Sequence, residues 1–300
     1  MRITVVGCGA LGSLFAVRLG ALGHNVQVLQ RAGARFESLR RAGLELIEAD
    51  ASVSRVPIAA IGASGSRLAP ARLVIVLVKS YATRELRDLP AALAADGVVL
   101  TLQNGLGNAE WLASEVGAKR LLAGTTTSGA YRDANGCVHW GGDGKTVIGP
   151  WASAADDASW VVTLLRDAGF DASRVDDPRA ALWQKLALNA MTNPLTALLG
   201  QPNGALAEHA PLEPLMRALA AEAAAAAARS DLQLVPDELW AAQRQNLATT
   251  ARNVSSMLQD VRAGRPTEIE SILGPIATTG AAPVAAALLT LVRALTAQRQ

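Results

Sequence analysis

The chain has 300 residues, of which 50% are hydrophobic and 18% are charged, and its formal net charge at pH 7 is +2. This length favours two domains, and the composition excludes a disordered chain because it can bury a sizeable core. The small net charge gives no support to nucleic acid or an anionic membrane surface as a partner, so any binding of anions must depend on locally placed Lys and Arg.

The first half of the chain alternates strand-like and helix-like segments. The run LVIVLV at 73–78 is continuously apolar, as expected for a strand that is buried on both faces of a parallel sheet. Strands that alternate with helices predict βαβ units in a doubly wound α/β sheet. The other predicted strands are 3–6, 26–29 and 98–102, and the predicted helices are 10–22, 82–95, 106–116 and 155–168.

Three more strand-like pieces, at 126–131, 137–139 and 145–148, lie between glycines and predict antiparallel additions to the sheet. After a polar junction at 171–178, Ala and Leu at helical spacing replace the β-branched runs, which predicts an all-α domain. The expected domains are 1–173 and 174–300. The predicted helices of the second domain are 179–199, 211–229, 236–262 and 267–280.

Several classes of protein are excluded by what the sequence lacks. No apolar run reaches the ~18 residues of a membrane span, and the apolar N-terminal stretch has no convincing signal cleavage site. Cys8 and Cys137 form no CxxC pair, and the three histidines fit no metal-ligand pattern. We therefore expect a soluble, cytoplasmic protein without a metal site.

A glycine-rich loop connects the first predicted strand to the first predicted helix. Gly7, Gly9 and Gly12 form the G-x-G-x-x-G pattern in the context that a dinucleotide-binding loop requires. The first glycine permits a tight turn, the second lets the backbone approach a pyrophosphate, and the third permits close packing of helix and strand. We therefore expect residues 7–12 (Gly7, Cys8, Gly9, Ala10, Leu11 and Gly12) to bind the cofactor.

The residues after the second strand indicate which cofactor is bound. An NAD enzyme usually has Asp or Glu about 20 residues beyond the loop to hold the ribose 2′-hydroxyl. The chain instead reads Leu29-Gln30-Arg31, and the Arg31 guanidinium can pair with a 2′-phosphate, which favours NADP. Arg35 is a possible helper, and a solvated loop arginine is the alternative interpretation of Arg31.

Polar residues at two strand ends and on one helix are candidates for carbonyl reduction. Lys79 and Asn104 follow strands 73–78 and 98–102, although a lysine at a strand end can also simply reach solvent. Lys185, Asn189 and Asn193 recur every four residues and therefore share one face of an apolar helix, as a functional site or a solvent-exposed stripe. The proline that follows them is expected to bend or break this helix.

The segment TEIE at 267–270 opens the last of these helices. Thr267 as N-cap and Glu270 three positions later would form a capping box, which places Glu268 at the first helical position. Because Glu270 fits the capping role, Glu268 is available for chemistry. The alternative is a first-turn acid that only complements the helix dipole.

At these residues the sequence resembles the ketopantoate reductase family. The motifs that carry the resemblance occur in order from residue 1 to about 274, and the later ones are the more specific. They are GCGALG at 7–12, VKS at 78–80, QNGLG at 103–107, GTTT at 124–127, LWQKL at 182–186, NPLTA at 193–197, PNG at 202–204, SSMLQD at 255–260 and TEIE at 267–270.

The resemblance implies a Rossmann domain, a helical domain of the 6-phosphogluconate dehydrogenase C-terminal type, and NADPH-dependent reduction of ketopantoate to pantoate in pantothenate (coenzyme A) biosynthesis. By position, Lys185 matches the family's catalytic lysine, which protonates the substrate oxygen. Glu268 matches the family's glutamate, which assists substrate binding and the proton balance. Arg31 matches the 2′-phosphate arginine. The substrate-binding positions are matched by Asn189, Asn193, Asn203 and Ser256, and the positions beside nicotinamide and substrate by Lys79 and Asn104.

Two other functions remain open on the sequence. One is the reduction of another branched 2-oxo acid, and the other is a non-catalytic NADPH-binding regulator, which would need neither Lys185 nor Glu268. After Gly274 the chain keeps only part of the family's pattern, so the oligomeric state, monomer or homodimer, also remains open.

Overall fold

The computed structural model describes residues 1–63, 68–133, 135–152 and 158–297, which fall into two compact units. The first unit consists of Met1–Gln103 and Gly107–Pro178. The second consists of Asn104–Leu106 and Arg179–Gln300. A short piece of the N-terminal half of the chain thus belongs to the second unit.

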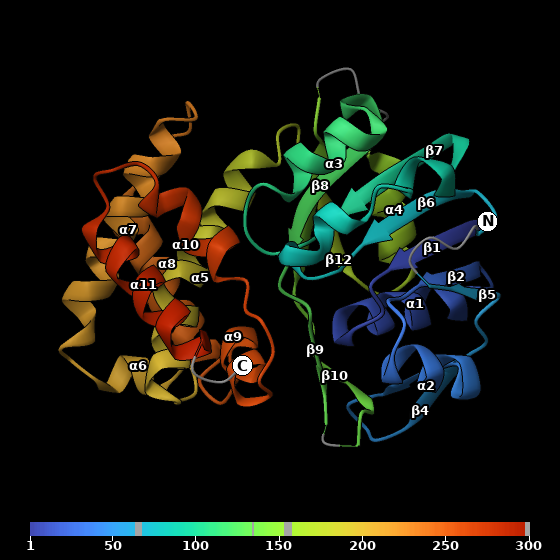
Figure 1. Cartoon of the computed structure of the whole chain (residues 1–300), viewed down its shortest axis with the longest axis horizontal. Coiled ribbons are helices and arrows are strands. Elements are labelled where there is room, and N and C mark those ends of the chain that lie inside the picture. Colours follow the sequence, from blue (N-terminus) through green and yellow to red (C-terminus); the bar gives the residue numbers. More distant parts are fainter. Residues whose placement is uncertain (64–67, 134, 153–157, 298–300) are drawn as a thin grey trace. The chain divides into compact units, whose positions relative to one another are not determined.

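An eight-stranded sheet forms the centre of the first unit, in the order β12-β11-β8-β7-β6-β1-β2-β5 (Figure 1). From β8 to β5 the neighbouring strands are parallel, whereas β11 pairs antiparallel with β8. The predicted doubly wound sheet is confirmed. Of the three pieces expected to extend it with antiparallel strands, 145–148 does so as β11, whereas the piece at 137–139 belongs to a separate sheet. The strands are β1 (Arg2–Val6), β2 (Asn25–Leu29), β5 (Ala60–Gly62), β6 (Ala71–Val76), β7 (Leu93–Thr101), β8 (Leu121–Thr126), β11 (Lys145–Pro150) and β12 (Asp171–Arg174).

The register of the central strands brings their carboxyl ends to one edge of the sheet. Val6 of β1 pairs with Leu29 of β2 and with Val76 of β6, and Val76 pairs with Thr101 of β7. The residues that follow these strands therefore emerge side by side, which is where open α/β sheets bind their ligands.

Helices cover both faces of this sheet. In Figure 1, α3 (Asn108–Val116) lies in front of the sheet and α4 (Ser159–Asp167) lies behind it. The predicted helix at 82–95 is wrong: two 3₁₀ turns, Ser80–Glu85 and Leu89–Ala92, lead directly into β7. The predicted polar junction at 171–178 is also partly wrong, because its first four residues form β12.

A second sheet, of four strands, packs on the first helix and was not foreseen. Helix α1 (Ala10–Ala21) contacts β1 and β2 of the large sheet, and also the small sheet in the order β4-β3-β10-β9. Gly20 permits this packing, since a Cβ there would collide with the side chain of Val56. The strands are β3 (Leu44–Ile47), β4 (Val53–Val56), β9 (Gly129–Arg132) and β10 (Val138–Gly142), so the single strand predicted at 126–131 is wrong.

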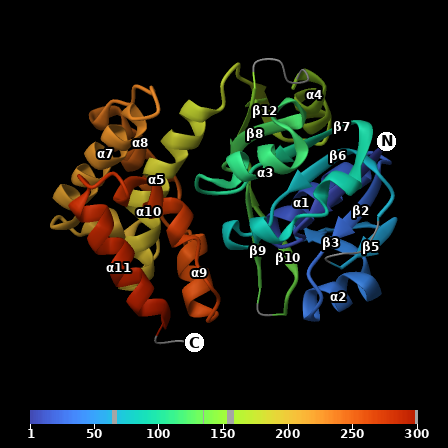
Figure 2. The same ribbon diagram turned by 45° about the horizontal axis from the view of Figure 1, so that its top comes forward.

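The second unit is helical, as predicted, and α5 (Arg179–Leu199) is its central element. Helices α7 to α11 all pack on α5 (Figure 2). The other helices of this unit are α6 (Ala205–Glu208), α7 (Leu212–Ala228), α8 (Pro236–Thr249), α9 (Ser256–Arg262), α10 (Ile269–Ala277) and α11 (Pro283–Ala297).

Among the described residues no helix is both long and apolar enough to cross a membrane.

Two helices of this unit differ from what the sequence predicts. The helix predicted at 236–262 is two helices, α8 and α9, separated by a turn. Pro194 does not break α5, which continues to Leu199. Residues 190–197 are all buried, so packing on every side offsets the ~3 kcal/mol that a proline costs inside a helix.

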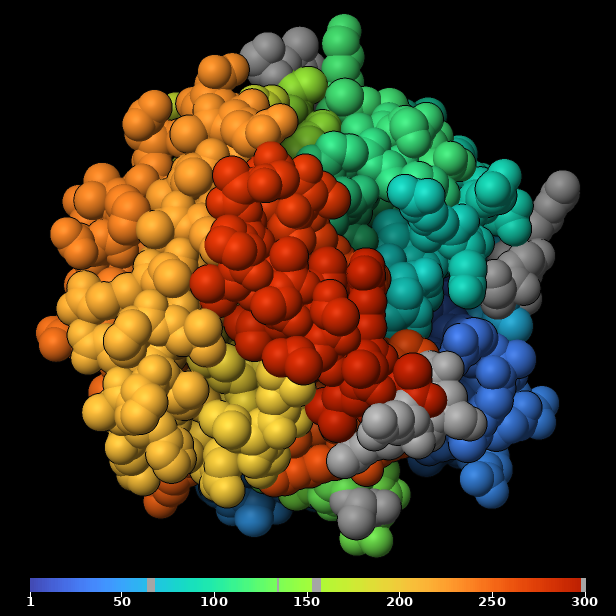
Figure 3. All heavy atoms as spheres, turned by 60° about the vertical axis from the view of Figure 1, so that its left-hand side comes forward, coloured from blue at the N-terminus to red at the C-terminus, as the bar shows by residue number. Residues whose placement is uncertain are grey.

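Glu222 of α7 binds the start of α11. The two carboxylate oxygens accept hydrogen bonds from the backbone N–H groups of Val284 and Ala285, each at 2.8 Å. These groups lie in the first turn of a helix, where backbone N–H donors have no partner within the helix. Figure 3 shows the surface of α10 and α11 (red) beside α7. The Glu222 contact thus joins α7 to α11.

Glu222→Gln is expected to lower the free energy of unfolding by roughly 1–2 kcal/mol, because it weakens a charge-assisted cap with two hydrogen bonds. Urea denaturation followed by circular dichroism measures this change. Glu238→Gln removes an exposed acid from the first turn of α8 and serves as the control, with a loss of only a few tenths of a kcal/mol expected. Equal losses in the two variants would argue against the capping role.

Candidate active site

The glycine loop has the backbone geometry that its sequence pattern predicts. Gly7 has a φ of +88°, and its N–H donates to the carbonyl of Leu29 at 2.9 Å. A Cβ on Gly7 would lie 2.6 Å from the backbone nitrogen of Val78, and one on Gly12 would collide with the carbonyl oxygen of Gly7. Both positions therefore require glycine.

Gly9 differs from these two glycines, because nothing lies within 4 Å of the place where its Cβ would be. Gly9 is the N-cap of α1, so the open space lies at the N-terminus of a helix, where backbone N–H groups and the helix dipole favour an anion. Room and charge both suit a pyrophosphate. The loop therefore fits the dinucleotide that the sequence predicts.

Two residues that follow β2, Gln30 and Arg31, differ in their surroundings. The Gln30 side chain points back to the loop and accepts the Cys8 backbone N–H at 2.8 Å. Because residue 30 is glutamine, it offers no carboxylate to a ribose 2′-hydroxyl. Arg31 is exposed and lies outside any helix or strand.

Gln103 joins the carboxyl ends of β6 and β7. Its side-chain amide donates to the carbonyl of Val78 and to the hydroxyl of Thr83, both at 2.8 Å. Lys79 follows Val78, is half-buried, and precedes the 3₁₀ turn that begins at Ser80. Gln103 thus holds the segment that carries Lys79. It was part of a sequence motif, but only its burial and its contacts reveal this role.

Lys185, Glu268 and Asn104 come together in the helical unit. The Asn104 side-chain amide donates to the Glu268 carboxylate at 3.5 Å, and Glu268 is buried. Loss of solvent lowers the pKa of the Lys185 ammonium to about 8, although the negative charge of Glu268 acts in the opposite direction and raises it. A lysine with this pKa is well matched to proton transfer near neutral pH.

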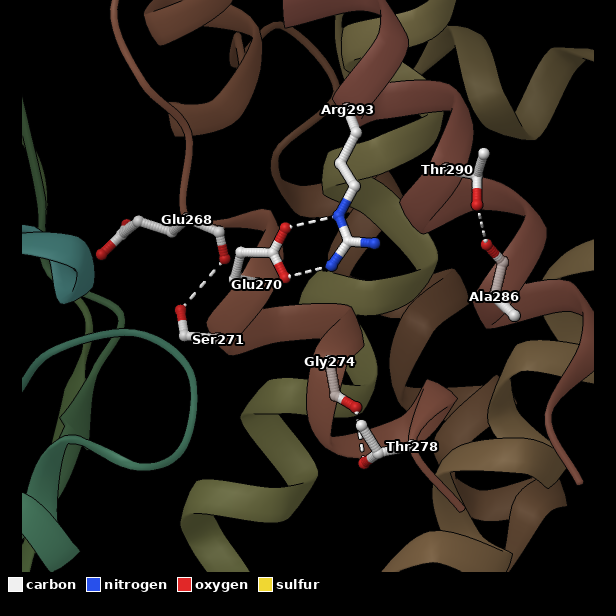
Figure 4. A network of polar contacts seen from close by, with 8 residues as sticks. All are labelled: Glu268, Glu270, Ser271, Gly274, Thr278, Ala286, Thr290 and Arg293. Carbon is white, nitrogen blue, oxygen red and sulfur yellow. Dashed lines mark hydrogen bonds and ion pairs between the residues drawn. The ribbon is translucent and has the colours of Figure 1, made fainter. Parts of the chain in front are cut away.

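The expected capping box at 267–270 is wrong. Glu268 is itself the N-cap of α10, and its backbone carbonyl accepts the Ser271 hydroxyl at 3.0 Å. Glu270 instead forms a two-pronged ion pair with Arg293 of α11, with both contacts at 2.6 Å. Figure 4 shows the Glu268 and Glu270 side chains pointing in different directions. Glu270 therefore has a structural role, as an ion pair between two helices and not as a cap.

Two of the other polar candidates lie on α5 with Lys185. Asn189 is half-buried and Asn193 is buried. Because they follow Lys185 at intervals of four residues on a continuous helix, the three side chains share one face. The helix face that carries Lys185, Asn189 and Asn193 is therefore not an exposed surface.

The remaining two candidates lie in the turns beside α5. Asn203 donates its side-chain amide to the Thr250 hydroxyl at 2.9 Å, and its buried side-chain carbonyl has no hydrogen-bond partner within the described part of the chain. Ser256 is half-buried at the start of α9. Its neighbour Ser255 caps that helix by accepting the Leu258 N–H at 3.1 Å, which leaves Ser256 for another role.

No group of three or more His, Cys, Asp or Glu residues in the described ranges could hold a metal ion. Cys8 is buried, and burial raises the pKa of its thiol. The Nε2 atom of His139 lies 3.0 Å from a carboxylate oxygen of Asp133.

Comparison with known proteins shows which family the sequence matches. The model of the family "Ketopantoate reductase PanE/ApbA" matches residues 3–153, and that of its C-terminal part matches residues 177–298. A 2-dehydropantoate 2-reductase of Halobacterium salinarum is 36% identical over 299 residues, which is 98% of either chain. One from Salmonella typhimurium is 36% identical over 275 residues, covering 91% of this chain and 86% of the relative.

Solved structures give the same fold. A PanE/ApbA family ketopantoate reductase from Ralstonia eutropha is 30% identical, covers both chains completely and superposes with a TM-score of 0.88. D-mandelate dehydrogenase in complex with NADH and anilino(oxo)acetate has a TM-score of 0.94 with 100% and 99% coverage, but at 23% identity it shows the fold alone. The reductase family that the chain matches implies a nicotinamide cofactor. The chain belongs to the ketopantoate reductase family.

Proposed function

We propose that the chain is a 2-dehydropantoate 2-reductase, which uses NADPH to reduce ketopantoate to pantoate in pantothenate and coenzyme A biosynthesis. The observation that carries the proposal is the pairing of Lys185, a lysine of lowered pKa, with the buried Glu268 in a chain whose glycine loop fits a dinucleotide. The relatives of the same family carry this name.

Lys185 is the proton donor in this proposal. Held at the glycine loop, NADPH would supply the hydride that C2 of the 2-oxo acid accepts. The Lys185 ammonium donates a hydrogen bond to the carbonyl oxygen, stabilises the negative charge that develops there, and transfers a proton to give the hydroxyl group. Glu268 keeps Lys185 protonated at neutral pH, because its carboxylate raises the pKa of the lysine.

The amide and hydroxyl groups near Lys185 are proposed to bind the substrate. Asn189, Asn193, Asn203 and Ser256 offer donors and acceptors to the substrate's carboxylate and hydroxyl groups. The unpartnered side-chain carbonyl of Asn203 supports this assignment, because a buried acceptor without a partner costs free energy that a ligand's hydroxyl could recover. Lys79 and Asn104 are proposed to contact nicotinamide and substrate.

The preference for NADPH is assigned to Arg31. Arg31→Ala is expected to raise KM for NADPH roughly tenfold or more, because it removes charge-assisted hydrogen bonds to the 2′-phosphate, with little effect on kcat. Steady-state kinetics with NADPH and NADH measure the change, and KM for NADH is the internal control. An unchanged ratio of kcat/KM between the two cofactors would remove Arg31 from the cofactor site.

The substrate is tested by following NADPH absorbance after adding ketopantoate, with NADH and other branched 2-oxo acids in parallel. Rapid oxidation with ketopantoate and NADPH is the expected result. Turnover only with another 2-oxo acid would make the chain a reductase of that acid. NADPH binding without any turnover would identify a non-catalytic regulator. A cytoplasmic location and a monomeric or homodimeric state are further parts of the proposal, for fractionation and size-exclusion chromatography to check.

A further inference from the structure

Arg35, in the first turn of α2 (Ala34–Ala42), makes contacts that its sequence position did not predict. Its Nε donates to the backbone carbonyl of Cys8 at 3.1 Å, and its Nη2 donates to the hydroxyl of Ser13 at 2.7 Å. The Ser13 hydroxyl in turn donates to the carbonyl of Gly9 at 2.7 Å. One guanidinium is thus connected to both ends of the Cys8–Gly9 segment of the glycine loop.

The Cys8 residue is held on its other side as well. Its N–H donates to the Gln30 side chain at 2.8 Å, and Gln30 follows β2 directly. The backbone donor and acceptor of Cys8 are therefore both bound by side chains that follow β2. Such a clamp fixes the peptide planes of the loop before any ligand arrives, which lowers the entropic cost of binding.

The same contacts bring positive charge to the start of α1. Arg35 is half-buried, and none of the ion pairs found among the described residues includes it. Burial is the main cause that lowers the pKa of its guanidinium, and the charge of Arg132 on β9 acts in the same direction. Since arginine stays protonated in proteins, the Arg35 guanidinium places a positive charge beside Cys8 and Ser13, which favours an anion there.

We propose that Arg35 is a positioning residue for the cofactor: together with Gln30 it clamps Cys8, and so holds the glycine loop in the conformation that accepts the pyrophosphate of a nicotinamide dinucleotide. This inference rests on the proposed function, because it presupposes that the loop binds such a dinucleotide. It assigns Arg35 and Arg31 to different parts of one ligand, the pyrophosphate and the 2′-phosphate.

Two fragments of the cofactor separate these parts. ADP-ribose contains the pyrophosphate but no 2′-phosphate, and adenosine 2′,5′-bisphosphate contains the 2′-phosphate but no pyrophosphate. We expect Arg35→Ala to weaken ADP-ribose binding about tenfold or more in isothermal titration calorimetry, since it removes a fork of two hydrogen bonds. Arg35→Lys, which keeps the charge but cannot bridge both partners, should fall between Arg35→Ala and the unmodified protein.

Two controls accompany these variants. Arg41→Ala removes an equal charge from the exposed last turn of the same helix and should leave ADP-ribose binding unchanged. Arg31→Ala should weaken the bisphosphate and spare ADP-ribose.

A second readout follows the loop without any ligand. Cys8 is fully buried and Cys137 is exposed, so in a Cys137→Ser background a thiol reagent reports on Cys8 alone. We expect Arg35→Ala to speed the labelling of Cys8 about tenfold or more, since the loss of the clamp lets the loop open, and Arg41→Ala to leave the rate unchanged. Thermal melts establish that the variants are folded. If Arg35→Ala does not fold, Arg35→Lys tests the role of the clamp in its place.

Three results would overturn the inference. Unchanged binding of ADP-ribose by Arg35→Ala and Arg35→Lys would show that the clamp is dispensable, and a loss confined to the bisphosphate would make Arg35 a ligand of the 2′-phosphate instead. If the unmodified protein bound neither ADP-ribose nor NADPH, the proposed function itself would fail, and this inference with it.

Discussion

Replacing Lys185 by alanine is expected to lower kcat for the 2-oxo acid by roughly 10²–10⁴-fold, the usual contribution of a positioned general acid. The variant loses both the proton donor and the cation that stabilises the developing alkoxide, whereas the cofactor loop is untouched. Stopped-flow or steady-state loss of NADPH absorbance measures the rate, and NADPH binding by fluorescence should stay near its normal value.

Gln184→Ala is the matched control for Lys185→Ala. Gln184 precedes Lys185 on α5 but is exposed, so its loss should change kcat little. A near-normal rate in Lys185→Ala would remove Lys185 from the mechanism. Equal losses in both variants would instead indicate a general disturbance of α5.

The pH dependence of kcat/KM is expected to change in Glu268→Gln. In the unmodified enzyme the reaction needs protonated Lys185, so kcat/KM should fall as the pH rises through about 8, the pKa of that group. Glu268 raises this pKa, so its neutralisation lowers the pKa and moves the alkaline limb to lower pH, by about one pH unit or more. At pH 8, Lys185 of the variant should therefore be largely deprotonated, and kcat/KM should be well below that of the unmodified enzyme.

Glu270→Gln is the control for this experiment. It removes an equal charge two residues away, but from an exposed carboxylate that pairs with Arg293. Its pH profile should match that of the unmodified enzyme, although its stability falls slightly. An unchanged profile in Glu268→Gln would contradict the electrostatic link between Glu268 and Lys185.

Much of the fold could be predicted because its elements have strong local patterns. Three glycines at defined spacing require one loop geometry, and the helix predicted at 179–199 has the boundaries of α5. The errors occurred where tertiary contacts overrule local preference. Proline usually breaks a helix, but the residues around Pro194 are buried, and their packing keeps α5 continuous. The helix predicted at 82–95 failed because its pattern could not separate two short turns from the start of β7.

The candidate site shows the same division. Spacing along one helix placed Lys185, Asn189 and Asn193 on a common face, since that relation is local. The proximity of Asn104 to Glu268 joins residues far apart in the chain, and no pattern within either segment encodes it. Glu270 is a similar case: its partner Arg293 lies on another helix, so the sequence alone suggested a cap instead.

The small sheet around α1 has a consequence for how the protein folds. Strands β3 and β4 supply one half and strands β9 and β10 the other, and β3 and β10 pair through Ile47 and His139, far apart in the chain. Such non-local pairing forms slowly, because the intervening chain must first be ordered. Helix α1 is synthesised before all four strands of this sheet, and its packing is complete only after the last two of them, β9 and β10, have been synthesised. A nascent chain that ends near residue 120 would therefore expose apolar surface on α1, and chaperones would be expected to recognise it there.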